Sequence, residues 1–114
     1  MNLKIIEKVK KINKENHFFN EISLIESGEK GKLSGIAISV KDCIVVKDME
    51  SRAGSKILSG YKAPFDATII EKIKAEGGTI IGKTAQDEFG HGSFATNVGV
   101  DFEVPLNPFD KERC

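Results

Sequence analysis

Lys41 has the position best suited to chemistry, because it directly follows an apolar run and precedes Asp42. The run, residues 36–40, alternates β-branched residues with small ones, which predicts a strand in a crowded sheet. Burial disfavours the charged form of a lysine, and the neutral amine can act as a base. The alternative, which composition alone favours, is a surface lysine whose stem is covered and whose charged end lies in water.

Cys43 offers a second kind of chemistry, a thiol nucleophile with His91 as its base. Only Lys41 and Lys47 make its neighbourhood electropositive, so a small packed thiol is the favoured interpretation. Cys43 and Cys114 are the two cysteines, and they lack the C-x-x-C spacing of a zinc site or a disulfide framework. We interpret both as reduced thiols and expect no metal site.

The stretch from Gly77 to Thr84 matches the letters of a phosphate-binding loop, G-x-x-x-x-G-K-[ST]. Such a loop follows a strand and begins a helix. Here a helix is expected before the stretch and a strand within it, so we reject a phosphate loop.

Three elements must position these residues. Ile5, Val9 and Ile12 have helical spacing, which predicts an amphipathic helix over 3–13 whose lysines lie in water. Residues 17–22 are interpreted as an apolar connector in which His17 is structural. Residues 36–40 form the strand before Lys41.

The most regular pattern lies between residues 66 and 83. Asp66 is expected to cap a helix that carries Ile69, Ile70 and Ile73 and ends at Gly77 and Gly78. A strand over 79–83 follows, so strand, helix and strand indicate an α/β fold with a parallel pair. One helical turn and a long glycine-rich loop are expected over 87–101. In all, about three strands and three helices are expected.

Composition excludes several classes of protein. The 114 residues include 17 basic and 17 acidic side chains, so bulk charge gives no sign of a polyanion partner. With 39% hydrophobic and 30% charged residues, and no apolar run of about 18 residues, the chain is neither disordered nor a membrane protein. The N-terminus has no signal peptide, which favours the cytoplasm. The polar stretch 105–114 leads us to expect missing sequence.

The stretch 31–42 reads G-K-L-S-G-I-A-I-S-V-K-D and resembles the G-x-L-x-G-[IV]-P-[IV]-x-[IV]-K-D segment of the amidase signature family. Further blocks follow in the family's order: S-K-I-L at 55–58, P-F-D-A-T-I-I-E-K-I at 64–73, G-K-T-A-Q-D-E-F at 82–89, G-S at 92–93 and N-P-F-D-K-E-R at 107–113. Ala37 and Cys43 depart from it, where proline and asparagine are frequent. Within the family, the blocks are most similar to the glutaminase subunits of tRNA-dependent amidotransferases.

The resemblance implies an α/β fold, the N-terminal portion of the amidase-signature fold with a mixed sheet covered by helices, incomplete in this chain. Residues 1–30 are expected to form an N-terminal helix and connector. Residues 31–114 are expected to form the N-terminal part of the amidase domain, truncated before its serine-rich signature.

The resemblance also implies site residues. Lys41 corresponds to the catalytic lysine of a Ser-cisSer-Lys triad, the amine that deprotonates a bridging serine and through it the nucleophile. Gly92 and Ser93 correspond to a turn near the bound amide substrate, although a left-handed turn would equally explain Gly92. Both triad serines belong to a glycine-rich and serine-rich stretch that follows the 107–113 block in the family. None of the serines present corresponds to the nucleophile, so this chain alone is expected to be inactive.

The activity implied is the release of ammonia from glutamine, which converts Glu-tRNA(Gln) to Gln-tRNA(Gln). This chain would bind no cofactor, and ATP and Mg would be used by a partner subunit. The implied partners are subunits B and C, glutamine and, through the complex, the mischarged tRNA, with no membrane. The alternatives are a stand-alone amidase that hydrolyses a small amide and a truncated protein that only binds a partner.

Overall fold

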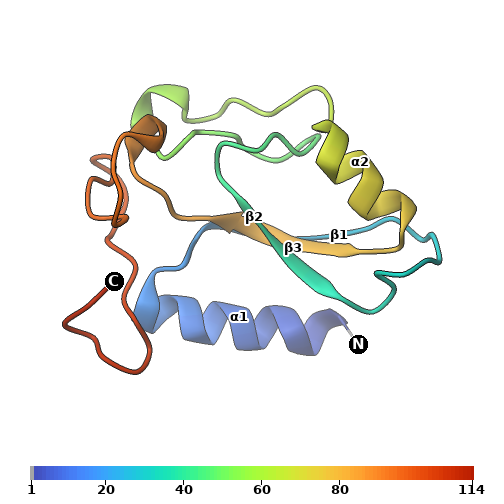
Figure 1. Cartoon of the computed structure of the whole chain (residues 1–114), viewed down its shortest axis with the longest axis horizontal. Coiled ribbons are helices and arrows are strands. Elements are labelled where there is room, and N and C mark those ends of the chain that lie inside the picture. Colours follow the sequence, from blue (N-terminus) through green and yellow to red (C-terminus); the bar gives the residue numbers. More distant parts are fainter. Residues whose placement is uncertain (1) are drawn as a thin grey trace.

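The computed structural model describes residues 2–114 and shows a three-stranded sheet with an α-helix on either side (Figure 1). The helices are α1 (Asn2–Asn16) and α2 (Thr68–Ala75), and the strands are β1 (Phe19–Glu26), β2 (Ala37–Lys41) and β3 (Thr79–Thr84). Two single turns of 3-10 helix, η1 (Lys56–Leu58) and η2 (Glu88–Gly90), lie in the long connections. The expected number of three strands agrees with the structure, and the strands predicted over 36–40 and 79–83 are confirmed as β2 and β3. The described chain has two α-helices and two short turns instead of three helices.

The sheet is mixed, as expected, with the strand order β1-β3-β2. β2 and β3 are parallel and are joined through α2, which confirms the predicted strand-helix-strand unit. β1 pairs with β3 in the antiparallel direction. The first 30 residues therefore contribute a strand to the same sheet as the rest, and a boundary after residue 30 stays a prediction.

β1 corrects the interpretation of residues 17–22 as a connector. The strand is half-buried from Phe19 to Ile25, and irregularities at two places interrupt its pairing with β3. Such irregularities break the alternation of apolar and polar residues that identifies a strand in a sequence. The pattern therefore lacked the signal on which the strand could have been predicted.

β2 was expected to lie in a crowded sheet, and this was wrong. It is an edge strand, and Val40 is its one buried residue, while Ala37, Ser39 and Lys41 are exposed. Ile38 and Val40 point to the core beneath α2, because side chains alternate along a strand. Lys41 is the last residue of the strand and points to the opposite face.

Helix α2 begins two residues later than Asp66, which is not its cap. Ala67 occupies the N-cap position without a side-chain hydrogen bond. The Asp66 carboxylate instead accepts hydrogen bonds from the backbone N–H of Lys47, at 2.7 Å, and from Nζ of Lys74, at 2.5 Å. The glycine end is confirmed: Gly77, at φ 78°, and Gly78 donate to the carbonyls of Lys74 and Ile73, which closes the helix in a Schellman motif.

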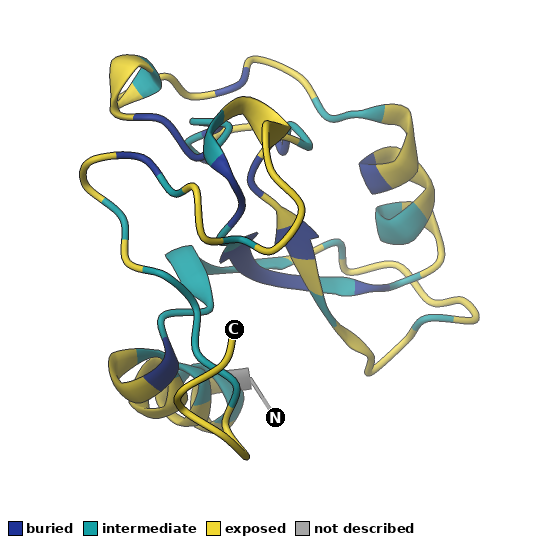
Figure 2. Ribbon diagram, turned by 60° about the vertical axis from the view of Figure 1, so that its left-hand side comes forward, coloured by how far each residue is buried: buried dark blue, intermediate teal, exposed yellow. Residues whose placement is uncertain are grey.

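The core lies between α2 and the sheet (Figure 2). It is formed by Val40, Val46, Met49, Ile70 and Ile80, each at most 3% exposed. Ile73 packs against this cluster, whereas Ile69 is 55% exposed, so the predicted stripe on α2 holds for two of its three isoleucines.

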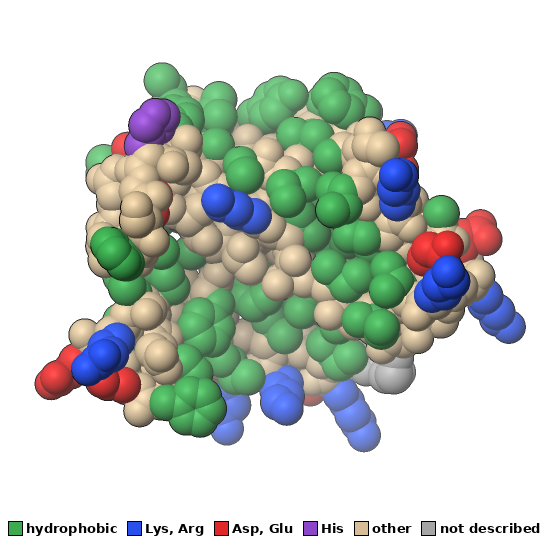
Figure 3. Space-filling model, in the orientation of Figure 1, with side chains coloured by type: hydrophobic (Ala, Val, Ile, Leu, Met, Phe, Trp, Pro, Cys, Tyr) green, Lys and Arg blue, Asp and Glu red, His purple; other side chains and the backbone are tan. Residues whose placement is uncertain are grey.

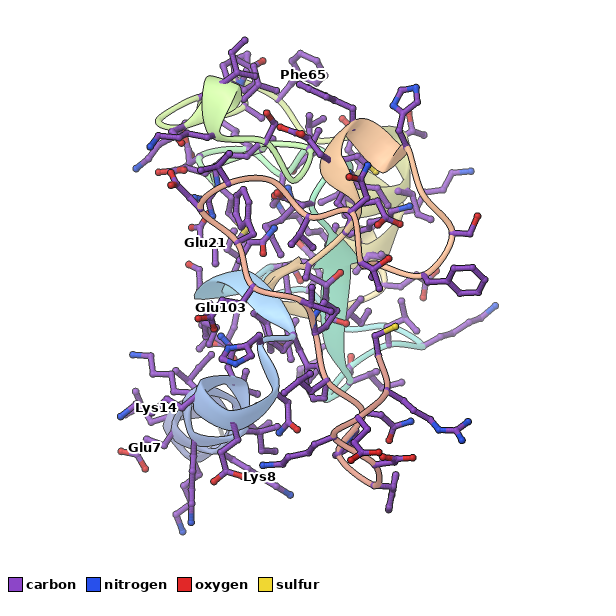
Figure 4. All side chains as sticks on the ribbon, turned by 90° about the vertical axis from the view of Figure 1, so that its left-hand side faces the viewer. Glu7, Lys8, Lys14, Glu21, Phe65 and Glu103 are labelled. Atoms are coloured by element: carbon purple, nitrogen blue, oxygen red, sulfur yellow. The ribbon has the colours of Figure 1, made fainter. Side chains whose placement is uncertain are left out.

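Helix α1 packs its half-buried residues Ile5 and Val9 toward the rest of the molecule. Its lysines are exposed, as expected, and Figure 4 shows Lys8 and Lys14 at the outside of the helix. Large apolar side chains are exposed elsewhere, and Figure 3 shows apolar atoms spread over the face seen there. No helix within residues 2–114 combines the length and the apolar character needed to cross a membrane.

The Asp66 contacts make a prediction about stability. Partial burial acts to raise the pKa of Asp66, but the Lys74 and Lys47 hydrogen bonds and charges outweigh it and hold the pKa below its usual 3.8. A carboxyl with a lowered pKa stabilises the fold above its unfolded pKa, and this stability is lost as the pH falls through the folded pKa. Asp66→Asn should therefore lower the free energy of unfolding by about 1.5–3 kcal/mol at pH 7.

The measurement is urea unfolding from pH 7 down to pH 3, with Asp48→Asn, which alters an exposed carboxylate, as control. The difference between the wild type and Asp66→Asn should shrink below about pH 4. A difference that does not vary with pH would contradict the assignment.

Candidate functional site

A cavity of about 230 Å³ lies at the carboxyl ends of β2 and β3. It is lined by Lys41 from the end of β2 and by residues of the segment that follows β3, namely Ala85, Gln86, Asp87, Gly90, Gly92, Ser93 and Ala95. The structure therefore brings the three predicted site residues, Lys41, Gly92 and Ser93, to one cavity. Larger hollows of about 300 and about 340 Å³ lie elsewhere, so volume alone does not single out this one.

The strands bring these segments together because β2 and β3 are parallel and end at the same edge of the sheet. Lys41 pairs with Thr84 in the strand register, and the next residue, Asp42, donates its N–H to the carbonyl of Thr84 at 3.2 Å. The chain after Thr84 thus runs beside the turn that follows Lys41. The Lys41 side chain is exposed, so the crowding that was expected to favour its neutral amine is absent from residues 2–114.

A second lysine, Lys83, escaped the sequence reasoning and is fully buried in β3. Its Nζ donates to the carbonyls of Asp42, at 3.1 Å, and Glu50, at 3.3 Å, and to Oγ of Ser51, at 3.1 Å. Burial lowers the pKa of Lys83, although the negative charge of Asp42 acts to raise it. The sequence signal that could have identified Lys83 as buried was its place at the end of an apolar strand, between Gly82 and Thr84. We interpreted these three residues only as the last letters of a phosphate-loop pattern.

The Asp42 carboxylate is 1% exposed and ties three segments together. Its Oδ2 accepts hydrogen bonds from Nδ2 of Asn20, at 3.0 Å, and from the N–H of Gly54, at 2.9 Å. Its Oδ1 lies 3.8 Å from Nζ of Lys83. A buried carboxylate with these partners holds the turn after Lys41 against β1, β3 and the loop before η1.

Gly92 needs to be glycine for a reason other than a left-handed turn. Its φ lies outside the left-handed region, and a Cβ atom there would fall on the carboxylate of Asp87. That carboxylate accepts hydrogen bonds from the backbone N–H groups of Asn97, at 2.8 Å, and Ala95, at 3.1 Å. The left-handed turn considered for Gly92 is thus wrong, and close packing explains the glycine.

The alternative pair, Cys43 and His91, is not joined. Both side chains are exposed, and within the described part of the chain neither a hydrogen bond nor an ion pair links them. The packed thiol expected at Cys43 is also wrong, because the residue is exposed in the turn after the edge strand β2. Nδ1 of His17 lies 2.6 Å from Oε2 of Glu103, a contact that fits a structural role. No cluster of His, Cys, Asp and Glu able to hold a metal occurs in residues 2–114.

Comparison with protein families finds that residues 14–114 match the amidase family. The A subunit of the glutamyl-tRNA(Gln) amidotransferase of Vitis vinifera, a chloroplastic and mitochondrial protein, is 44% identical over 93 residues, which cover 82% of this chain and 17% of that protein. The A subunit numbered 1 of the same amidotransferase in Clostridium acetobutylicum is 49% identical over 90 residues, 78% of this chain and 18% of that protein. The chain thus spans less than a fifth of the length of these curated relatives.

Among solved structures, the A subunit of the glutamyl-tRNA(Gln) amidotransferase of Thermotoga maritima superposes with a TM-score of 0.83 at 31% identity. The match covers 96% of this chain and 24% of that one. 6-Aminohexanoate cyclic dimer hydrolase matches with a TM-score of 0.76 at 21% identity, over 94% of this chain and 24% of that one, a likeness of fold alone. The mixed α/β fold expected from the sequence is therefore confirmed as part of this larger fold.

The buried Lys83 makes a prediction about pH dependence. Because its folded pKa lies below the usual 10.5, the unfolded chain binds more protons in the window between the two values. The contribution of Lys83 to the free energy of unfolding should therefore rise with pH across that window. Lys83→Met should lower stability by about 3–5 kcal/mol at pH 7, since it leaves the Asp42 carboxylate buried without its partner.

The measurement is the difference in urea unfolding between the wild type and Lys83→Met from pH 7 to pH 10.5, with Lys56→Met as the exposed control. The difference should widen as the pH rises. Should Lys83→Met not fold, NMR titration of the Lys83 amine in the wild type gives the same information. A midpoint at or above 10.5 would contradict the prediction.

Proposed function

Because the chain belongs to the amidase family, we propose that it forms the N-terminal part of a glutaminase subunit of a tRNA-dependent amidotransferase. The observation that carries the proposal is that Lys41, Gly92 and Ser93 line one cavity at the ends of two parallel strands. Relatives at 44–49% identity that are named as A subunits of glutamyl-tRNA(Gln) amidotransferases support it.

In the proposed reaction, Lys41 is the base. Its neutral amine takes a proton, through a bridging serine, from a nucleophilic serine that lies outside residues 1–114. The serine oxygen forms a bond to the amide carbon of glutamine, and the carbon–nitrogen bond breaks as the proton passes to the leaving nitrogen. Ammonia leaves, and water then hydrolyses the ester to glutamate and restores the serine.

Gly92 and Ser93 are proposed to lie against the bound amide. Because Gly92 has no side chain, the backbone at this position can pack against the Asp87 carboxylate. The exposed Ser93 that follows can offer its hydroxyl and backbone N–H to a ligand in the cavity. These contacts would orient the substrate relative to the Lys41 amine.

The wider proposal concerns partners. Subunits B and C would receive the ammonia and use it, with ATP and Mg bound by the partner subunit, to amidate glutamate on the mischarged tRNA. This chain itself would bind no cofactor and would be inactive alone, without the serines. The proposal includes a cytoplasmic location.

The decisive experiment transplants residues 31–113 into the corresponding part of the A subunit from Clostridium acetobutylicum and assembles the chimera with the partner subunits of that organism. The chimera should release ammonia from glutamine. Removal of a general base costs about 10²- to 10⁴-fold in rate, so Lys41→Ala in the chimera should lower kcat by that factor.

Lys47→Ala, which alters an exposed lysine outside the cavity, is the matched control and should leave kcat unchanged. Full activity of Lys41→Ala would refute the assigned role. A chimera that hydrolyses simple aliphatic amides without the partner subunits, and not glutamine, would instead indicate a stand-alone amidase.

A further inference from the structure

We propose that Gln86 and Asp87 are positioning residues that set the separation of Lys41 and Ser93 across the cavity. The inference rests on the proposed function, since it assigns these two adjacent residues a role at the same site. Each of them binds the backbone of one wall of the cavity, and both lie within three residues of the end of the buried strand β3.

Gln86 holds the wall that carries Lys41. It is 4% exposed, and its Oε1 accepts a hydrogen bond from the backbone N–H of Cys43 at 2.8 Å. Cys43 lies in the tight turn that begins at Lys41, which the N–H of Ile44 closes by donating to the carbonyl of Lys41 at 2.9 Å. Moving the Gln86 amide would therefore move the backbone from which the Lys41 side chain extends.

Asp87 holds the opposite wall. The residue is 8% exposed, and its carboxylate accepts from the N–H groups of Ala95 and Asn97, one on each oxygen. Ala95 has a φ of 54°, a left-handed conformation that an alanine keeps only where its surroundings hold it. Because Gly92 also packs on this carboxylate, the loop that carries Ser93 is shaped around Asp87.

The two side chains come from neighbouring backbone positions that are hydrogen-bonded to each other. Gln86 Nε2 donates to the carbonyl of Asp87 at 3.2 Å, and the backbone of Asp87 is extended, at φ −60° and ψ 143°. Neighbouring residues in an extended chain direct their side chains to opposite sides. Consecutive residues can therefore bind the two walls at once, and a displacement of about 1 Å at such a site costs up to about 10²-fold in rate.

The first test measures amide hydrogen exchange by NMR in the 114-residue chain. Asp87→Asn replaces an acceptor oxygen by an NH₂ group that faces a backbone N–H, so the amides of Ala95 and Asn97 should exchange about tenfold faster or more. Gln86→Leu should do the same to the Cys43 amide alone, and Gln86→Glu, which keeps an acceptor, should restore its protection. Unchanged exchange at Ile80 and Ile81 would show that the variants are folded.

The second test measures glutamine hydrolysis in the assembled chimera. Gln86→Leu acts through Lys41 and should lower kcat by about 10- to 100-fold with little change in KM. Gln86→Glu, which keeps the acceptor for the Cys43 N–H but loses the donor to the Asp87 carbonyl, should recover part of that loss. Asp87→Asn acts through the substrate loop and should mainly raise KM. Asp110→Asn is the matched control, since Asp110 accepts from the N–H of Glu112 in an exposed turn outside the cavity, and neither constant should change.

The outcomes separate the two proposals. An unmutated chimera that is inactive overturns the proposed function, while the exchange data still decide whether the two side chains hold the two walls. Unchanged exchange at Cys43, Ala95 and Asn97 overturns the positioning role even in an active chimera. Equal changes of kcat and of KM in all variants would show a structural contribution only and would also overturn it.

Discussion

The arrangement of the site depends on a buried amine, that of Lys83. A lysine amine enclosed in a protein is tolerated only where it finds hydrogen-bond acceptors, which Asp42, Glu50 and Ser51 provide, with the Asp42 carboxylate close by. These partners come from the end of β2 and the loop before η1, so a single side chain of β3 holds two other segments in place. The turn after Lys41 cannot shift without breaking this cluster.

The same constraint sets which lysine is accessible. In the parallel pair, Val40 lies beside Lys83 and Lys41 lies beside Thr84. Because side chains alternate, Val40 and Lys83 face the core and Lys41 faces the other side. A slip of β2 by one residue would bury Lys41 and expose Val40, which the core and the Lys83 cluster both oppose. The register of one strand pair thus separates a buried lysine from an exposed one that lines the cavity.

Sequence reasoning succeeded where a local pattern and a local structure coincide. Helix α2, its glycine end and β3 have strong signals within a few residues, and so does the position of Lys41 at the end of β2. It failed at β1, whose irregular pairing removes the alternation, and at Asp66, whose carboxylate binds the N–H of Lys47 and the amine of Lys74 instead of capping the helix.

It also failed for every contact that joins distant segments, because these contacts leave no local pattern. The bond from Cys43 to Gln86 and the contact of Lys83 with Asp42 each span more than forty positions and connect residues of ordinary types. The position of Lys41 at the end of a strand could therefore be predicted, but not the side chains that hold the turn after it.

The two lysines divide properties that a base needs together. Lys83 is buried and has a lowered pKa, but it is fully enclosed, and its amine is occupied by three acceptors. Lys41 has access to the cavity, yet it is exposed, and burial is what favours a neutral lysine amine. The strand pair thus separates the two properties: the enclosed amine is held by acceptors, and the accessible amine opens on the cavity that Gln86 and Asp87 border.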